Sequence, residues 1–185
     1  MLEWPLAVQF WKVLWLDWQW VVDVNMWGVI HGLRVFVPAM LAQDTECHIV
    51  NTASVVGLLS NFTSSSYHVT KHAVVALSEQ LYHSLSEMNT KVKTSVLCPG
   101  WVRTRILDAS RNRPNQIQDK SSNEQVTGNH FLQEALESGV SPEIVAEHVF
   151  HAIREYKFYI LVNADEYKSL IRMRMDNILG ESNPT

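Results

Sequence analysis

Glycine, cysteine and net positive charge are all scarce in this chain of 185 residues. Its seven glycines are scattered, and none belongs to a glycine-rich turn of the kind that holds phosphates between a strand and a helix. The two cysteines, Cys47 and Cys98, have no metal-binding or redox spacing, so we expect both to be small core residues of buried strands in a reducing compartment. A formal net charge of -4 argues against a nucleic-acid-binding protein, whose surface is normally basic.

The sequence also lacks a secretion signal and a long uninterrupted apolar run. Its N-terminus, MLEWPLAVQFW, has neither a basic first region nor a small-residue cleavage site. The most apolar stretch, VNMWGVIHGL, is interrupted by Asp23 and Arg34 before it reaches the roughly 18 residues that a membrane span needs. The tryptophan-rich segment WKVLWLDWQWVV carries acidic residues where interfacial membrane helices carry basic ones. We therefore expect a cytoplasmic protein with no membrane partner.

Three segments carry helix signals. Apolar residues recur at helical spacing over 14–42 and again over 65–88, and Pro38 is expected to kink the end of the first helix. Ser141-Pro142-Glu143 opens another helix, with serine at the N-cap and proline at the first helical position. Residues 105–139 are polar and rich in Asn, Gln and Ser, which predicts a loop with one short helix around FLQEALES.

Three short apolar runs alternate with these helices. They are CHIVNTA (47–53), TSVLC (94–98) and FYILV (158–162), and such nearly continuous runs are typical of strands covered on both faces. Alternating helices and strands predict an α/β domain with a parallel sheet and right-handed crossovers, which place helices on both faces. The length and apolar content suit a single domain over 1–185. We find no internal repeat.

Two segments follow directly after predicted strands. Ser54 comes after CHIVNTA, and PGWVRT (99–104) comes after TSVLC. Ligands of open parallel sheets bind beyond the carboxyl ends of the strands. We therefore expect Ser54 and PGWVRT to line one crevice.

Tyr67 and Lys71 lie four residues apart in the predicted helix 65–88, so their side chains share one face. A free phenol has a pKa of about 10 and is a poor base at neutral pH. An ammonium at about 4 Å favours the phenolate by about 4 kcal/mol at an effective dielectric constant near 20, which lowers the phenol pKa by up to ~3 units. The spacing therefore predicts a tyrosine that exchanges a proton with a substrate oxygen. Tyr-x-x-x-Lys by itself is a weak motif, because ordinary composition supplies it often.

Three further motifs accompany this pair, and together they resemble the short-chain dehydrogenase/reductase family. Ser54 precedes Tyr67 by thirteen residues, at the end of a strand. Asn25 stands in N25-M-W-G28, within the preceding helix, and P99-G-W-V-R-T104 follows the next strand. The family carries the same four motifs in the same order, and the resemblance extends from about residue 12 to the end of the chain.

The resemblance implies a role for each motif residue. Tyr67 is expected to be the general acid/base, and Lys71 to lower its pKa and to bind the nicotinamide ribose. Ser54 is expected to hold the substrate oxygen, and Asn25 to hold a water that connects Lys71 to solvent. The expected neighbours of the nicotinamide, besides Tyr67 and Lys71, are Pro99, Gly100, Val102 and Thr104. For Asn25 an ordinary helix asparagine and for Thr104 a helix N-cap remain the alternatives.

The family's phosphate-binding segment, T-G-x-x-x-G-x-G, and its N-N-A-G segment have no counterpart here. The resemblance therefore implies that the chain is the C-terminal portion of a Rossmann-like doubly wound parallel sheet, with three recognisable strands and roughly 80 preceding residues absent. We expect only the nicotinamide half of an NAD or NADP site, and the choice between the two cofactors stays open. CHIVNTA is then expected to leave one strand edge unpaired, which invites association.

Two hypotheses of different classes follow. The first is an NAD(P)-dependent oxidoreductase that interconverts a small-molecule alcohol and a carbonyl. The alternative is an N-terminally truncated, catalytically incompetent relative that acts only as an association module. In either case the resemblance implies a homo-oligomer formed through helices 14–42 and 65–88, and it implies that 105–139 is a flexible loop over the substrate. An apolar substrate pocket is weakly suggested by Trp101 and by Val55, Val56, Leu58 and Leu59.

No metal site is expected. His68 and His72 lie four apart on a predicted helix, but the glutamate of H-E-x-x-H and a third ligand at matching spacing are missing. His148 and His151 also lack further ligands.

Overall fold

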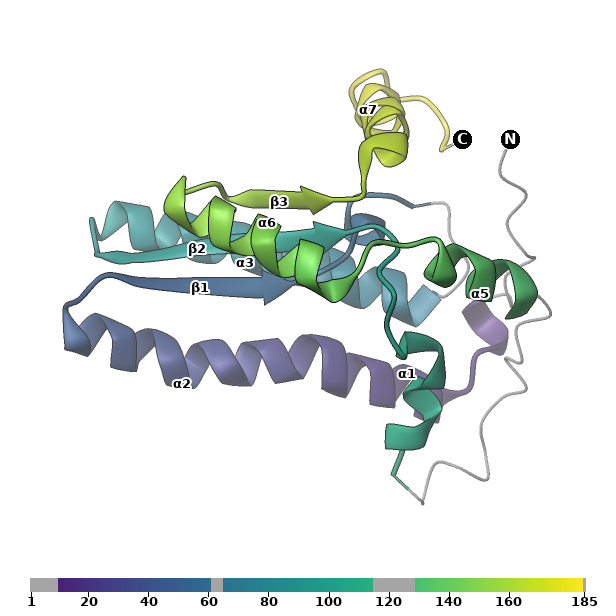
Figure 1. The fold of residues 1–185 in the computed structure, drawn as a ribbon, viewed down its shortest axis with the longest axis horizontal. Coiled ribbons are helices and arrows are strands. Elements are labelled where there is room, and N and C mark those ends of the chain that lie inside the picture. The colour runs from purple at the N-terminus through teal and green to yellow at the C-terminus, as the bar shows by residue number, and fades with distance from the viewer. Residues whose placement is uncertain (1–9, 61–64, 115–128, 185) are drawn as a thin grey trace.

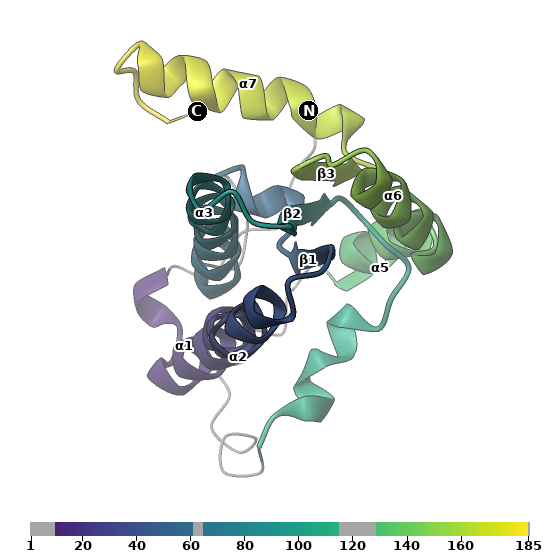
Figure 2. The same ribbon diagram turned by 90° about the vertical axis from the view of Figure 1, so that its left-hand side faces the viewer.

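The computed structural model describes residues 10–60, 65–114 and 129–184. Its centre is a parallel sheet of three strands in the order β1-β2-β3, formed by β1 (Cys47–Thr52), β2 (Val92–Pro99) and β3 (Tyr159–Val162). All three arrows point the same way in Figure 1. Helix α3 (Ser65–Glu87) lies on one side of the sheet and α6 (Pro142–Arg154) on the other (Figure 2). The expected α/β architecture with helices on both faces is confirmed.

Two apolar clusters hold these layers together. On the α3 side, Val74 and Val75 pack with Val96 and Cys98 of β2. On the α6 side, Ala152 packs with strand residues that point the other way, namely Leu97, Ile160 and Val162. Both faces of β2 are therefore covered, as its continuous apolar sequence predicts.

β1 differs from the prediction. Among the described residues it pairs only with β2, so its outer edge is open, as expected. Its first four residues, however, are only half-buried, and the expectation of a strand covered on both faces is wrong for them. Cys47 lies in this half-buried part, whereas Cys98 is fully buried, so the expected core role holds only for Cys98. The reason is that an edge strand is sheltered by one neighbouring strand instead of two.

The predicted helix 14–42 is present but is not uniform. It consists of α1 (Trp15–Val22), a π-helical segment η2 (Asp23–Trp27) and α2 (Gly28–Gln43). Pro38 lies inside α2, which continues past it to Gln43, so the helix does not end at this proline. Proline removes only one backbone donor, and the helix tolerates that loss.

The joined helix Trp15–Gln43 has a mean hydropathy of 1.3 in its most apolar window and is long and apolar enough to cross a membrane, by length and composition alone. The expectation that no apolar stretch reaches this length is wrong by that measure. In the structure the helix packs along α3 through α1 and η2. Figure 1 shows α2 running beside β1 for most of its length.

The remaining elements are short or were not expected. The helix at Ser141 is confirmed as α6, with Ser141 at its N-cap position. The predicted short helix of the polar region is α5 (Asn129–Glu137), and the rest of that region within 115–128 lies outside the described residues. The sequence patterns did not indicate the 3-10 segment η4 (Ile106–Asn112) or α7 (Asp165–Leu179). Two other 3-10 turns are η1 (Phe10–Lys12) and η3 (Val55–Gly57).

Candidate active site

Ser54 lies immediately beyond β1, where the chain turns into η3. Its extended backbone makes it the N-cap of that turn, and its Oγ accepts a hydrogen bond from the N–H of Val56 at 3.4 Å. The same Oγ donates to the carbonyl oxygen of Pro99, also at 3.4 Å. Ser54 and the start of PGWVRT therefore meet at the carboxyl ends of β1 and β2, as the topology predicted.

Tyr67 is the third residue of α3 and is half-buried. Burial raises the pKa of the Tyr67 phenol, and a hydrogen bond with the Ser54 side chain offsets part of that rise. The two hydroxyl groups thus face each other across the gap between α3 and the end of β1. The predicted Ser54–Tyr67 pair is brought together.

Lys71 lies one turn further along α3. Its Nζ lies 5.5 Å from the centre of the Tyr67 ring and donates to the carbonyl oxygen of Thr52 at 3.0 Å. Burial lowers the pKa of Lys71 to about 8, and the charge of Cys98 offsets part of that fall. Contact between Lys71 and Tyr67 is as predicted.

The expected net lowering of the Tyr67 pKa is not found: burial raises the pKa of this phenol despite the nearby Lys71. The ammonium lies over the ring and is held by the end of β1, while burial of the phenol is the largest effect on its ionisation. The state described therefore contains a protonated phenol at neutral pH. A protonated phenol suits a proton donor.

Asn25 reaches this region from the π-helical segment η2. Its Nδ2 donates to Thr70 Oγ1 at 3.2 Å, and Thr70 Oγ1 donates to the carbonyl oxygen of Tyr67 at 2.9 Å. Thr70 is fully buried. Asn25 was expected at this site and Thr70 was not, although a hydroxyl residue between Tyr67 and Lys71 on one helix face is a signal that the sequence contains.

The PGWVRT residues diverge after Pro99. The Gly100 N–H donates to the carbonyl oxygen of Val162 at 2.8 Å, which continues the pairing of β2 with β3. A Cβ on Gly100 would lie 2.1 Å from the carbonyl oxygen of Asn163, so only glycine fits. Val102 forms an isolated parallel bridge with Val140. Thr104 is exposed, and the N-cap of η4 is Arg105, so Thr104 neither caps a described helix nor joins the other predicted residues.

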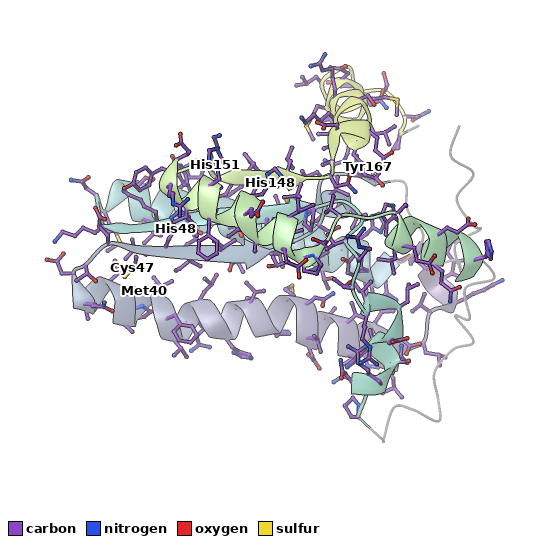
Figure 3. The ribbon with its side chains drawn as sticks, in the orientation of Figure 1. Met40, Cys47, His48, His148, His151 and Tyr167 are labelled. Carbon is purple, nitrogen blue, oxygen red and sulfur yellow. The ribbon has the colours of Figure 1, made fainter. Side chains whose placement is uncertain are left out.

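Apolar residues near the site pack into the protein core. Val55 and Leu59 are buried against Ala164 and Tyr167, and Trp101 packs against the same cluster. The weak expectation that they line a substrate pocket is thus not supported for Val55 and Leu59. Burial, followed by the charge of Glu166, raises the pKa of Tyr167 to about 12, and Figure 3 shows Tyr167 at the base of α7 beyond the end of β3. The packing of Tyr167 beneath the residues that follow Ser54 was not expected from the sequence.

Within the described ranges, no group of three or more His, Cys, Asp or Glu residues could hold a metal ion. His148 and His151 lie on α6, on the opposite side of the sheet from α3 (Figures 2 and 3). Two hollows, of about 410 and 340 Å³, lie along α7 and beside the ends of α2 and α3, and neither is lined by Ser54, Tyr67 or Lys71. The arrangement therefore places a serine hydroxyl, a phenol and an ammonium group together at the carboxyl end of β1.

Comparisons with known proteins agree with this geometry. Residues 8–115 match the family model described as short chain dehydrogenase. Over 184 residues the chain is 29% identical to a "CLA biosynthesis dehydrogenase/reductase" of Lactiplantibacillus plantarum, covering 97% of this chain and 64% of that protein. It is 34% identical over 164 residues to a "1-deoxy-11-beta-hydroxypentalenate dehydrogenase" of Streptomyces avermitilis, covering 87% and 52%. The chain thus spans between about half and two thirds of the length of these relatives.

A solved structure shows a closer likeness. A crystal structure of a short chain dehydrogenase/reductase from Burkholderia phymatum, in complex with NAD, is 41% identical, with a TM-score of 0.90. The match covers all of this chain and 66% of the other. A short-chain dehydrogenase from Novosphingobium aromaticivorans is 26% identical with a TM-score of 0.71, and the match covers 98% of this chain and 56% of that one.

Proposed function

Because this chain belongs to the short-chain dehydrogenase family, we propose that it provides the catalytic end of a cytoplasmic NAD(P)-dependent oxidoreductase. The reaction interconverts an alcohol and a carbonyl in a small molecule. The observation that carries the proposal is the meeting of Ser54, Tyr67 and Lys71 beyond the carboxyl end of β1. Open parallel sheets bind their ligands at this end.

Each of the three side chains has a distinct task. Ser54 and Tyr67 bind the substrate oxygen between their hydroxyl groups and hold it at the end of the sheet. In carbonyl reduction Tyr67 gives its proton to that oxygen, and in alcohol oxidation it takes the proton back. The raised pKa of Tyr67 keeps the phenol protonated at neutral pH, which favours the role of acid in the state described.

The donor set fits the nicotinamide half of a dinucleotide. An ammonium has three N–H donors, and Thr52 accepts from Lys71 with its carbonyl oxygen, so further donors of Lys71 can bind ribose hydroxyls. With a pKa of about 8, Lys71 is about nine-tenths protonated at pH 7. Pro99 and Gly100 would flank the ring, with Val102 and Thr104 further along the chain. When bound, the nicotinamide donates or accepts the hydride.

The polar region 105–139 is proposed to cover the substrate. Arg113, at the end of η4 in this region, contacts α1: it forms an ion pair with the buried carboxylate of Asp17 and lies over the Trp20 ring, 4.7 Å from the ring centre. This contact holds the end of η4 beside the helix that carries Asn25. A covering loop excludes water from the reacting atoms.

The test is cofactor binding followed by turnover. The chain is titrated with NADH and separately with NADPH, and nicotinamide fluorescence is followed. Micromolar binding of either supports the proposal, and the two affinities decide the cofactor. Oxidation of 1-phenylethanol and 2-octanol by the matching oxidised cofactor is then measured by nicotinamide absorbance. Absence of binding at millimolar NADH and NADPH would overturn the proposal for this chain.

A second candidate is an association module without catalysis. Large apolar side chains are exposed along the joined helix, among them Trp27, Val35 and Phe36. Such a face is suited to a second copy of the chain, packed through helices 14–42 and 65–88. Light scattering after size-exclusion chromatography distinguishes the cases: a dimer that binds neither cofactor favours the module, and a dimer that binds one favours the enzyme.

A further inference from the structure

We infer that Thr70 is a positioning residue of the active site, which fastens the turn that carries Tyr67 to Asn25 of the neighbouring helix. The expected effect on turnover rests on the proposed function. The structural role of Thr70 rests on its hydrogen bonds with Asn25 and Tyr67. Asn25 Nδ2 donates to Thr70 Oγ1 at 3.2 Å, and Thr70 Oγ1 donates to the Tyr67 carbonyl oxygen at 2.9 Å. The buried hydroxyl of Thr70 thus connects η2 to the turn of α3 that carries Tyr67.

The position of Tyr67 in α3 explains why its turn needs support. Tyr67 is the third residue of the helix, and the first four N–H groups of a helix have no partner within it. Helix ends therefore fray more readily than helix centres. Thr70 supports this turn through a contact outside the helix: its Oγ1 donates to the Tyr67 carbonyl oxygen and accepts from Asn25 Nδ2, which links the turn to η2.

Three residues of one α3 face are each tied to a different element. Tyr67 contacts Ser54 after β1, Lys71 donates to the end of β1, and Thr70 accepts from η2. Residues at i, i+3 and i+4 share a face, so the three ties act on one turn. Of these three α3 residues, Thr70 is the fully buried one, and its hydrogen bonds lie away from where a substrate oxygen would bind.

The π-helical segment η2 accounts for the position of Asn25. A π-turn holds one residue more than an α-turn, so it rotates the side chains that follow by about 100°. Asn25 lies at the middle of Asp23–Trp27, where this rotation occurs. Such π-helical segments interrupt the regular hydrogen bonding of an α-helix and are frequent at functional sites. Here the bulge coincides with the hydrogen bond to Thr70.

The chain contains a second bridge of the same chemistry, which serves as a matched control. Asn51 Nδ2 donates to Ser78 Oγ at 3.0 Å, and Ser78 Oγ donates to the Val74 carbonyl oxygen at 2.7 Å. Ser78 is fully buried on the same helix, two turns beyond Thr70. Loss of its hydroxyl has a similar structural cost but does not touch the Tyr67 turn.

The experiment compares Thr70→Val, Thr70→Ser and Ser78→Ala in the full chain. The first readout is NMR of [ζ-¹³C]tyrosine-labelled protein, with the Tyr67 signal assigned by its loss in Tyr67→Phe. We expect Thr70→Val to shift and broaden the Tyr67 signal and to change its titration, and Thr70→Ser and Ser78→Ala to leave both as in the wild type. This readout needs neither cofactor nor turnover.

The second readout is steady-state oxidation of 1-phenylethanol or 2-octanol, whichever the wild-type chain turns over. We expect Thr70→Val to lower kcat about tenfold with little change in cofactor KM, and Thr70→Ser to restore it. If the wild type binds no cofactor, the proposed function fails while the NMR result still decides the role of Thr70. An unchanged Tyr67 signal in a folded Thr70→Val protein overturns the inference, as does an equal disturbance in Ser78→Ala. Should Thr70→Val not fold, Asn25→Ala removes the same tie from the other side, and an undisturbed Tyr67 signal there overturns it equally.

Discussion

The two ends of the parallel sheet are built from similar residue types but in opposite surroundings. At the carboxyl end, Tyr67 and Lys71 are desolvated, and burial shifts the pKa of each toward its neutral form. At the amino end, Lys91 forms an ion pair of 3.0 Å with Asp44, in which the two side chains are 55% and 80% exposed. Figure 3 shows Met40 and Cys47 near this end and Tyr167 near the other.

The difference shows which end of the sheet holds ionisable groups with shifted pKa values. The amino-end lysine also donates to the Asp44 carbonyl oxygen at 2.9 Å, so it caps the C-terminus of α2 and is free to exchange with solvent. The carboxyl-end lysine is held by β1 in a place that disfavours its charge. An exposed ion pair of this kind contributes little to the free energy of unfolding. The pKa of a desolvated group, in contrast, can be changed by a bound ligand.

The largest expected difference between the two ends is catalytic. Tyr67→Phe removes the proton donor, and we expect it to lower turnover about 10²- to 10⁴-fold while NADH or NADPH binding stays close to wild type. The measurement is kcat by nicotinamide absorbance beside fluorescence titration. The control is Lys91→Met, which we expect to leave turnover unchanged. Wild-type turnover in Tyr67→Phe would remove Tyr67 from the mechanism.

The next effect concerns packing. Gly100→Ala places a Cβ 2.1 Å from the Asn163 carbonyl oxygen, so the end of β2 must move away from β3, and we expect a loss of about 3 kcal/mol in the free energy of unfolding. Gly32→Ala, in the interior of α2 with no atom within 4 Å of the new Cβ, is expected to gain about 0.5 to 1 kcal/mol. Urea unfolding measures both. Equal stability of the two variants contradicts the close approach at Gly100.

The third effect sets the two lysines against each other. Burial lowers the pKa of Lys71 to about 8 in the fold from its ordinary value of 10.5, so the unfolded chain binds more protons between those pH values and stability rises with pH there. Lys71→Met removes this cost, and we expect up to about 3 kcal/mol of added stability at pH 7 that disappears towards pH 10.5. Lys91→Met should change stability by less than about 1 kcal/mol. Urea titrations at several pH values test this; a Lys71→Met gain that is independent of pH would contradict it.

The smallest expected difference concerns the reactivity of the two cysteines, and it involves no change in stability or activity. Cys98 is fully buried, and burial raises its pKa to about 12, whereas Cys47 at the open edge of β1 is half-buried. We expect a disulfide-exchange reagent to modify Cys47 in the native protein and both cysteines after unfolding. Cys47→Ser should then show no native reaction. Fast native labelling of Cys98 would mean that the carboxyl end of β2 opens readily.

The sequence was sufficient for most elements with a strong period. The 65–88 pattern matches α3, and the three apolar runs match the three strands to within two residues at most boundaries. α7 was missed because its sequence, DEYKSLIRMRMDNIL, mixes charge on nearly every turn, and only its contacts through Tyr167, Leu170 and Ile171 mark it as part of the core. Pro38 lies within α2 and does not end it, because a helix can continue past the loss of one backbone donor.

The sequence predicted which residues meet at the candidate site, but it did not predict their pKa shifts. Local spacing placed Tyr67 beside Lys71, and topology placed Ser54 beside Pro99. The sign of the Tyr67 pKa shift was wrong, because a pairwise charge estimate leaves out desolvation by the rest of the fold. The Asn25–Thr70 hydrogen bond spans forty-five residues, so no local pattern encodes it.

The amino-acid sequence by itself determined the alternation of helices and strands, the parallel sheet and the shared helix face of Tyr67 and Lys71. These follow from short-range periodicity and from the rule that parallel strands end on one side of the sheet. Only the tertiary structure decided how deeply those groups are buried, which carbonyl holds Lys71 and which buried hydroxyl steadies Tyr67. Desolvation and long-range hydrogen bonds depend on which distant segments come within a few ångströms, and residue spacing carries no record of that.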